Sequence, residues 1–585
     1  MRTIADRDIV DPTLRQVLPA GVGFLHHDLP STDAQLVLKL YQTAAIRVLV
    51  APASQCYSLP VTAHCVVVMG TEKYDGREKR HVDYPIADLL HMMGKASRPN
   101  EDASGKCVLF CHTPKKDHLK KLLYEPLPIE SHLDHYLHDH FNSEIVTKTI
   151  GSLQDAVDYL TWTLLYRRLT KNPNYYNLQG TSNVHLSEHL SEMVETVLGD
   201  LEESKCCTMT DEGDVSPLNL GMIAAYYYIQ YTTIELVASS VTAKTKTRGV
   251  LEILAAASEF ASSLDMRLGD DKELQILART LMHPLPDGTQ YNDPNTKALV
   301  LLQCHFSRKA LRNSDLRADQ KLVLKDSLKL IQAIVDVISS NGWLKPALAA
   351  MELSQMVVQG LWNKDHVLMQ IPHFTQEIID RCDAYSRDIR QNKSKKDDED
   401  DEDEAIEAVF DILTLDDDVR NDLLRLPDDK MSDVAAFCNN YPNVDVSFNV
   451  VDADEVTAGD PVQVTVTLER DVDDDDDDDD QVWGVVTAPL YPKEKKEGWW
   501  IVIGDTKTNS LLSLKRVGLQ KKQKVALEFV APEEPGDYDL TLFCMSDCYL
   551  GCDQEFSVPL SIAAADDDDD EDESGDDEGE SVGND

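Results

Sequence analysis

The 585-residue sequence lacks the loop by which motor enzymes hold nucleotide phosphates. No G-x-x-x-x-G-K-[ST] motif occurs, and the pairs Gly94-Lys95 and Gly105-Lys106 are not followed by a hydroxyl residue that could hold magnesium. No Asp-Glu-x-His or Asp-Glu-x-Asp box ends an apolar strand, and no G-x-S-x-G elbow is present. These absences exclude independent ATP hydrolysis by known motifs, so we predict no catalytic residue.

Metal and membrane signals are also scarce. The twelve cysteines include no C-x-x-C pair, and the histidines of SHLDHYLHDH do not have the spacing of a single metal site. No signal peptide opens the sequence, and no apolar run reaches membrane-spanning length. We therefore expect reduced thiols in a soluble intracellular protein, no metal and no membrane partner.

Acidic residues are abundant but concentrated. The formal net charge is −48, and runs of eight, eight and thirteen acidic residues lie at 397–404, 473–480 and 566–585, with no Lys or Arg among them. Such tracts are typical of disordered, solvated segments, and acidic tracts can also attract basic partners. Because the excess is localised, it does not argue against nucleic-acid binding by the folded parts.

Residues 1–125 have the pattern of an α/β domain. Apolar runs at 46–51, 65–69 and 107–111 predict buried strands, and 31–45 and 85–96 predict helices. Strands that alternate with helices favour a mostly parallel sheet, although only about half the strands of a nucleotide-binding motor are present.

Residues 126–216 are predicted to be helical with one strand. The segment 153–169 is strongly amphipathic, 186–204 is a second helix, and 206–209 is a candidate wing strand. Helices closed by a strand suggest a winged helix. Arg167, Arg168 and Lys171, near the end of the first helix, are candidate RNA contacts; a solvated helix end is the alternative.

The stretch 217–249 links this module to an all-helical region, 217–371. Asn219 is a candidate N-cap, and Met222, Ala225, Tyr226 and Ile229 follow at helical spacing. The stretch ends in a basic run, Lys244, Lys246 and Arg248, which contains further candidate RNA contacts. The ordinary alternative is a buried helix with a solvated end.

The remaining chain changes from helix to strand. Residues 372–442 predict a short helical domain with the acidic insert 397–404, and 443–562 alternate like an immunoglobulin- or fibronectin-like β-sandwich with the acidic loop 473–480. We expect a disordered acidic tail at 563–585. Trp499 and Trp500 should face opposite ways on one strand, so one is expected in the core and the other exposed as a candidate protein contact.

Several stretches closely resemble one family. These stretches occur in the order found in the tandem-cassette DExH-box RNA helicases of the spliceosomal U5 particle. They are YEPLPIESHLDHYLHDHFNSEIVTKTI, DAVDYLTWTLLYRRLTKNPNYYNLQG, LGMIAAYYYIQYTTIEL, SSNGWLKPALAAMELSQMV and EGWWIVIGDTKTNSLLSLKRV. The resemblance is to the C-terminal cassette and runs from about Gly21 nearly to Gln554. It implies a multidomain fold: part of a RecA-like domain, a winged helix, a helical bundle with a ratchet helix, a short helical domain and a β-sandwich, the last three forming a Sec-sixty-three-type unit. The first RecA-like domain is missing.

The resemblance also implies that the motor motifs have decayed. Active cassettes have the motif Q-x-x-G-R-A-G-R, whose arginines reach ATP. At the same place this sequence has HMMGKASR, in which Gly94 and Arg98 are retained. The first arginine of the motif is replaced by Lys95, which cannot make a bidentate contact. The coupling motif has become SQCYSLPVTAH, with only Ala63 and His64 retained at its end.

Two functions remain open. The first is a non-catalytic scaffold of the nuclear splicing machinery that binds spliceosomal proteins, among them an active helicase cassette. The second is an RNA-binding helicase half, contacting snRNA or pre-mRNA, that uses ATP only when a missing first RecA-like domain is supplied. A weaker third class, an endoplasmic-reticulum translocation factor, lacks support because neither a membrane span nor an HPD motif is present.

Overall fold

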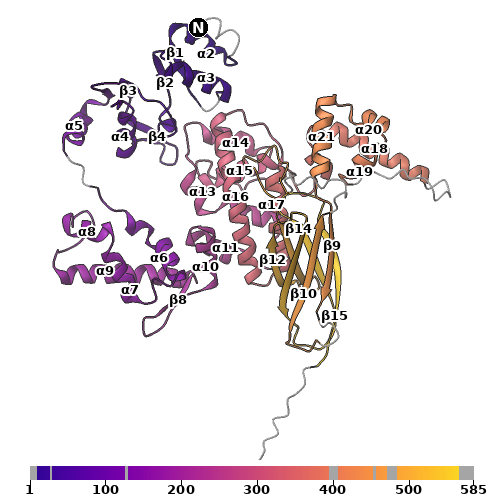
Figure 1. Cartoon of the computed structure of the whole chain (residues 1–585). Helices are drawn as coiled ribbons and strands as arrows, with labels where there is room; N and C mark the ends of the chain where they lie inside the picture. Colours follow the sequence, from indigo (N-terminus) through magenta and orange to yellow (C-terminus); the bar gives the residue numbers. More distant parts are fainter. Residues whose placement is uncertain are drawn as a thin grey trace, which may run out of the picture. The chain divides into compact units, whose positions relative to one another are not determined.

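The chain forms two compact units in a computed structural model (Figure 1). The structure describes residues 9–26, 29–125, 129–393, 406, 408–451, 456–470 and 484–564. One unit comprises residues 1–340 with 356–365 and 488–493, and the other comprises 341–355, 366–487 and 494–585. The three acidic tracts predicted as insert, loop and tail lie outside the described residues.

The first 125 residues contain two small parallel sheets instead of one continuous sheet. Strand β1 (Val22–Phe24) pairs with β2 (Val48–Val50), and β3 (Cys65–Met69) pairs with β6 (Lys106–Phe110). The described residues of this part also form four α-helices: α2 (Pro12–Val17), α3 (Ser31–Gln42), α4 (Ile86–Gly94) and α5 (Lys116–Tyr124). The predicted strands are therefore confirmed in position, but the prediction that they are buried is wrong. Val48 and Val50 of β2, Val67 and Met69 of β3, and Phe110 of β6 are each at least half exposed.

A short hairpin, which the sequence patterns did not predict, projects from this α/β part. Its strands are β4 (Glu72–Asp75) and β5 (Arg80–Asp83). At its tip the Gly76 amide donates to the Met266 carbonyl at 2.7 Å, and an Arg77 guanidinium nitrogen donates to the Leu264 carbonyl at 3.0 Å. A Cβ at position 76 would lie 2.4 Å from the Met266 oxygen, so this close approach requires glycine.

Residues 133–217 form a helical module closed by a two-stranded ribbon. Its helices are α6 (Leu137–Val146), α7 (Leu153–Thr161), α8 (Leu164–Lys171) and α9 (Asn183–Glu203). The predicted wing strand is confirmed as β7 (Cys207–Met209), paired with β8 (Val215–Pro217). The single helix predicted over 153–169 is wrong. It is interrupted after Thr161, where the Thr163 side chain caps α8, and Leu164 is consequently half exposed and not in the core.

The stretch 217–249 contains two helices, α10 (Asn219–Tyr227) and α11 (Tyr231–Ser240), where the sequence suggested one. Leu218, not Asn219, occupies the N-cap position. The predicted apolar face is also wrong, because Met222 and Tyr226 are exposed while Ile223 and Ala224 are buried. The neighbouring helices decide this, since α10 packs against α6 and against α16 (Ser314–Ser340).

The bundle that follows is organised around a buried lysine. Its remaining helices are α12 (Thr247–Ala255), α13 (Ser258–Ser263), α14 (Asp270–Ala278) and α15 (Pro294–Phe306). Lys297 on α15 is fully buried, and its ammonium lies 2.6 Å from carboxylates of Asp270 on α14 and Asp319 on α16. Arg267 also binds Asp319. The charges of three helices are thus neutralised in one interior cluster.

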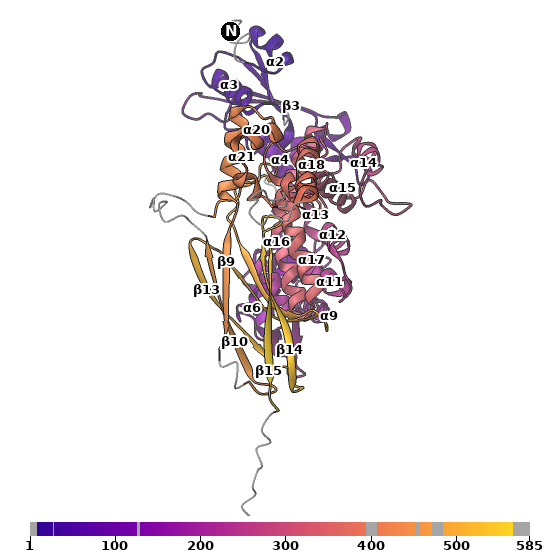
Figure 2. The same cartoon turned by 90° about the vertical axis from the view of Figure 1, so that its right-hand side faces the viewer.

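The second unit contains two antiparallel sheets (Figure 2), β13-β10-β9 and β12-β11-β14-β15. The strands are β9 (Val444–Val450), β10 (Pro461–Arg470), β11 (Trp499–Asp505), β12 (Ser510–Val517), β13 (Lys522–Val530), β14 (Gly536–Ser546) and β15 (Gln554–Ile562). Helices α18 (Gln376–Lys393), α19 (Asp411–Thr414), α20 (Asp417–Leu424) and α21 (Asp428–Asn440) precede them.

The expectation that one of Trp499 and Trp500 is exposed is wrong, because both are buried. Trp499 belongs to the interior cluster between the sheets. The other face of β11 is covered by α17 (Leu344–Gln359), whose first twelve residues belong to this unit. A Cβ at Gly504 would lie 2.9 Å from Leu344, and Ser354 donates to the Asp547 carbonyl at 2.9 Å. An indole on either face is therefore removed from solvent.

The contact of α10 with the winged-helix module gives a first prediction. A methyl group at Gly221 would lie 2.2 Å from the Cys206 carbonyl oxygen and 2.6 Å from Asn142 Oδ1, whereas nothing lies within 4 Å of one at Gly199, in α9. We expect Gly221→Ala to lower the free energy of unfolding by about 1–3 kcal/mol. Gly199→Ala should be neutral or slightly stabilising. Chemical denaturation of the full chain measures both, and equal effects would contradict the packing.

Candidate functional site

The two segments that the resemblance identifies as motor motifs, residues 54–64 and 91–98, lie against each other. The Ala63 amide donates to the Lys95 carbonyl at 2.9 Å, and Lys95 Nζ donates to the Leu59 carbonyl at 2.7 Å. Gly94 ends α4, so both motifs meet where this helix turns back toward the loop after β2. The structure thus brings together the parts of the sequence that the resemblance assigns to nucleotide contact and coupling, and it places the Lys95 ammonium on a backbone carbonyl.

Arg98 is held by acidic residues of its own turn. Its Nε donates to Asp102 at 2.8 Å and its Nη1 to Glu101 at 2.8 Å, while His64 Nδ1 lies 3.1 Å from the same Asp102 carboxylate. The Arg98 hydrogen bond, and then that of His64, lower the pKa of Asp102 below its usual range. An arginine in such a local network must exchange these partners before it can bind a phosphate.

The three basic residues of the winged-helix module have different surroundings. Arg168 makes a two-point contact with Glu130 at 3.1 and 2.7 Å, and Asn172 and Tyr176 donate to the same carboxylate. These contacts, that of Arg168 first, lower the pKa of Glu130 to about 2. Arg167 and Lys171 are exposed. Arg168 therefore has a structural partner, and the other two side chains face solvent.

The basic run before α12 is accessible. Lys244, Lys246 and Arg248 are exposed, whereas the residues between them are less so. The Thr245 hydroxyl accepts from the Thr242 amide at 2.9 Å, which holds the turn that presents this run. Arg248 pairs with Glu252 one helical turn later, at 2.9 Å. The arrangement allows contact with an extended polyanion.

Sequence reasoning missed a second basic strip with an aromatic residue at its end. Lys321, Lys325 and Lys329 lie four residues apart on α16, the longest helix described, and the first two are exposed. Lys329 Nζ donates to the carbonyl of Tyr228 at 3.3 Å. Tyr228 has a left-handed backbone (φ 54°) and is 87% exposed. The four-residue spacing was visible in the sequence, but the proximity of Tyr228 was not.

Cations beside an exposed aromatic ring are what single-stranded nucleic acids require, for phosphate contact and for base stacking.

The described residues contain no group of three or more His, Cys, Asp or Glu side chains arranged for a metal ion. Within the same described part, no helix combines the length and apolar character needed to cross a membrane.

Family models match two parts of the chain. A Sec63 Brl domain model matches residues 217–559, more than half of the sequence. The chain belongs to the Sec63 Brl domain family. A winged helix-turn-helix model matches residues 130–211, directly before the Sec63 Brl region, which confirms the predicted winged helix.

Longer relatives contain this whole arrangement. The chain is 52% identical over 556 residues to the U5 small nuclear ribonucleoprotein 200 kDa helicase of Mus musculus and 50% identical over 558 residues to that of Drosophila melanogaster. It is 50% identical over 554 residues to the DExH-box ATP-dependent RNA helicase DExH12 of Arabidopsis thaliana. Each match covers 95% of this chain, which spans about a quarter of the relatives' length and corresponds to their C-terminal part.

The Glu130–Arg168 contact gives a second prediction. Since the folded-state pKa of Glu130 lies below its ordinary value of 4.5, its contribution to stability is present above that value and is lost as the pH falls toward 2. Glu130→Gln should therefore lower the Tm by a few degrees at pH 7, and the difference from the original chain should shrink between pH 5 and pH 3. The control is the same substitution at an exposed residue of α9, Glu188→Gln, which should leave the Tm unchanged. A difference that does not change with pH would contradict the assignment.

Proposed function

We propose that this chain is a non-catalytic helicase-derived cassette that acts as a protein-interaction and regulatory scaffold in pre-mRNA splicing. The main support for this proposal is that the basic residues of the nucleotide-contact motif are already engaged within the chain. Lys95 donates a hydrogen bond to the Leu59 carbonyl, and Arg98 donates hydrogen bonds to Glu101 and Asp102. The similarity to U5 helicases supports a nuclear spliceosomal setting. The expected partners are spliceosomal proteins, among them an active helicase cassette.

A scaffold needs surfaces that do not depend on a nucleotide cycle. In the Sec63 Brl region, the bundle has a buried cluster of paired charges and the sandwich has both faces of β11 covered. Rigid, fully packed elements present a constant surface, which favours stable association over a motor stroke. Because Lys95 and Arg98 are engaged internally, we expect no cofactor in the scaffold state.

The scaffold proposal predicts binding without catalysis. The purified chain should co-sediment with purified U5 particles, also after RNase treatment, and should show no ATP turnover with or without RNA oligonucleotides. Arg98→Ala should change neither result, because Arg98 is assigned no motor role. RNA-stimulated ATP hydrolysis that Arg98→Ala abolishes would contradict the proposal.

A second candidate is the RNA-binding half of an ATP-dependent DExH-box helicase whose first RecA-like domain is supplied from elsewhere. The observation that favours it is the exposure of Lys244, Lys246 and Arg248, together with the lysines of α16 and the ring of Tyr228. In this case RNA phosphates would bind the basic run and a base would stack on Tyr228.

This candidate predicts a local effect of charge reversal. Changing Lys244, Lys246 and Arg248 to Glu should weaken binding of a single-stranded RNA oligonucleotide and reduce the slope of log K against log salt by about 2, since about 0.7 is lost for each phosphate contact. The control reverses Lys507, Lys515 and Lys524, which are exposed on the sandwich. Unchanged binding, or an equal loss in the control, would exclude a specific RNA contact at the basic run.

A further inference from the structure

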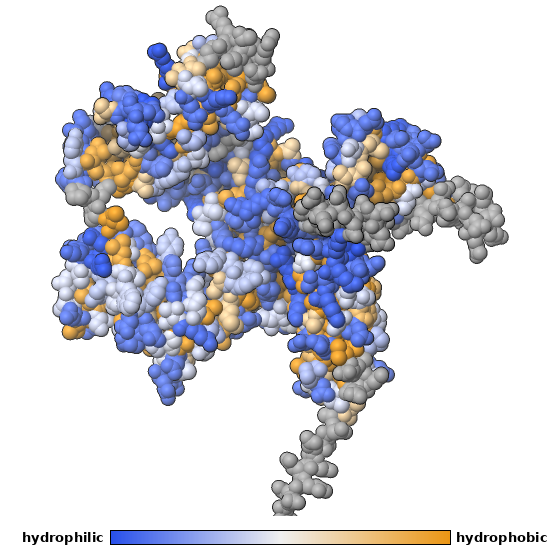
Figure 3. Space-filling view, in the orientation of Figure 1, coloured by the Kyte–Doolittle hydropathy of each residue, from blue (hydrophilic) through white to orange (hydrophobic). Residues whose placement is uncertain are grey.

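One segment of the sandwich is basic, although the formal net charge of the whole chain is −48. This segment, residues 506–527, contains β12 and the first part of β13, which lie next to each other. It has no acidic residue, and its basic residues are Lys507, Lys515, Arg516, Lys521, Lys522 and Lys524. Figure 3 shows mostly hydrophilic residues on the upper part of the sandwich. A local excess of one charge creates a positive potential at this surface.

Three of these lysines form a strip along β13. Lys522 and Lys524 are two residues apart, so their side chains share one face of the strand. Lys515 of β12 joins them, because its Nζ donates to the carbonyl of Ala526 of β13 at 2.5 Å. All three lysines are exposed. The lysine strip, Lys515, Lys522 and Lys524, therefore presents positive charge from two neighbouring strands to solvent.

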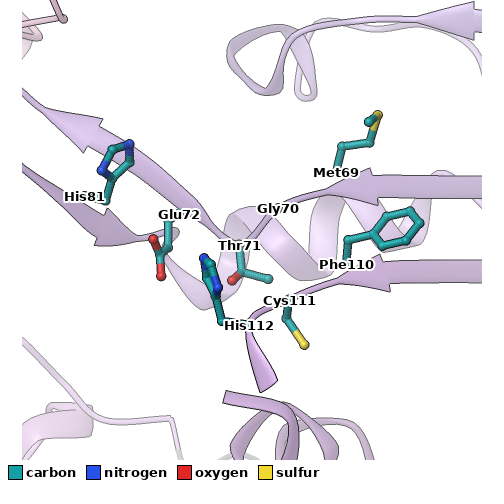
Figure 4. A pocket seen from close by; sticks show the side chains of 8 residues that line it. All are labelled: Met69, Gly70, Thr71, Glu72, His81, Phe110, Cys111 and His112. Carbon is teal, nitrogen blue, oxygen red and sulfur yellow. The ribbon is translucent and has the colours of Figure 1, made fainter. Parts of the chain in front are cut away.

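Two lysines of the strip have no acidic partner. Lys522 pairs with Glu469 of β10 at 2.7 Å, but Lys515 and Lys524 form no salt bridge with any residue that the structure describes. Lys115 in the α/β part shows the contrasting arrangement. It pairs with Glu72, which lines the cavity in Figure 4, at 2.5 Å. The charges of Lys515 and Lys524 thus remain available to an external anion.

The sandwich offers no surface for base stacking. None of its described Phe, Tyr or Trp residues is exposed. Single-stranded nucleic acids bind through stacking of their bases on such rings as well as through their phosphates. The lysine strip therefore supplies charge without stacking, in contrast to the lysines of α16 beside the exposed Tyr228.

The geometry of the strip fits an extended polypeptide. Its strand, β13, is an outer strand of the three-stranded sheet (Figure 2). Side chains on one face of an extended chain recur every two residues, about 7 Å apart, and Lys522 and Lys524 have this spacing. Lysines at a sheet edge hinder pairing with an uncharged strand, whereas they attract an acidic one.

We propose that the lysine strip binds an extended, carboxylate-rich segment of a partner protein. Alternate carboxylates of that segment pair with Lys524 and Lys515, and Lys522 continues the positive surface toward the beginning of β13. The proposal rests on the proposed scaffold function, to which it adds the chemical class of one partner segment. Exposed charges contribute more to the rate and specificity of association than to affinity, so this contact suits a reversible interaction.

The test measures binding of an acidic peptide to the full 585-residue chain by fluorescence anisotropy. The probe is a labelled peptide of alternating Glu and Ala, about sixteen residues long, so that its extended length exceeds that of β13. We expect saturable binding at low salt that is lost at about 0.5 M salt, because exposed charges are screened. The strip variant, Lys515→Glu with Lys524→Glu, should weaken binding about tenfold, since two attractions become repulsions.

Three comparisons separate this contact from a general effect of charge or folding. Lys515→Arg with Lys524→Arg keeps both charges and should bind like the original chain. Lys244→Glu with Lys246→Glu reverses the same number of charges in the basic run and should leave peptide binding unchanged. The strip variant should keep the Tm within a few degrees, because exposed charges contribute little to stability. If its Tm falls further, Lys524→Gln replaces it and should still weaken binding severalfold.

Several outcomes would overturn the proposal. These are no saturable binding of the peptide, an equal loss in the basic-run variant, or preferential binding of an RNA duplex that the strip variant abolishes. The scaffold function is tested separately by co-sedimentation with U5 particles. Peptide binding without co-sedimentation would support the lysine strip and contradict the scaffold function, whereas co-sedimentation without peptide binding would contradict the lysine strip alone.

Discussion

The buried Lys297 ammonium is the interaction on which the first unit depends most. It joins α14, α15 and α16 through Asp270 and Asp319, and its own side chain is fully inaccessible to solvent. Breaking such a cluster by removing one partner leaves an uncompensated buried charge, which typically costs about 3–5 kcal/mol. Lys297 also donates to the carbonyl of Asp265, next to Met266, which receives the hairpin tip. The charge cluster therefore positions the surface on which the α/β part rests.

Two kinds of functional surface emerge from this framework. Lys95 and Arg98, which the resemblance assigns to nucleotide contact, are engaged by neighbouring groups. The basic residues of the run before α12, and Lys321 and Lys325 of α16, are exposed. The internal contacts of Lys95 and Arg98 support the proposed role as a protein-binding scaffold. The accessible lysines of the basic run and of α16 support RNA binding in the second proposed function.

Local sequence signals predicted the elements well but not their neighbours. The strands of the α/β part and the wing strand lie where alternation placed them, and the region 217–371 is helical as predicted. The helix over 153–169 was wrong because a single capping threonine, Thr163, divides it. The exposed side of α10 and the burial of Trp500 could not be predicted, since they are decided by α6, α16 and α17, which are distant in sequence. The RecA-like and immunoglobulin-like descriptions remain predictions.

The sequence by itself determined the change from α/β to helical to strand patterns along the chain and the absence of a phosphate-binding loop motif. These properties depend on residue identity and local periodicity, which a single chain displays directly. Only the tertiary structure decided which basic residues are paired, which faces of the sheets are covered and which side chains meet at the motor motifs. Burial and pairing depend on contacts between segments far apart in the chain, so Arg168 and Arg167 differ in role although they are adjacent in sequence.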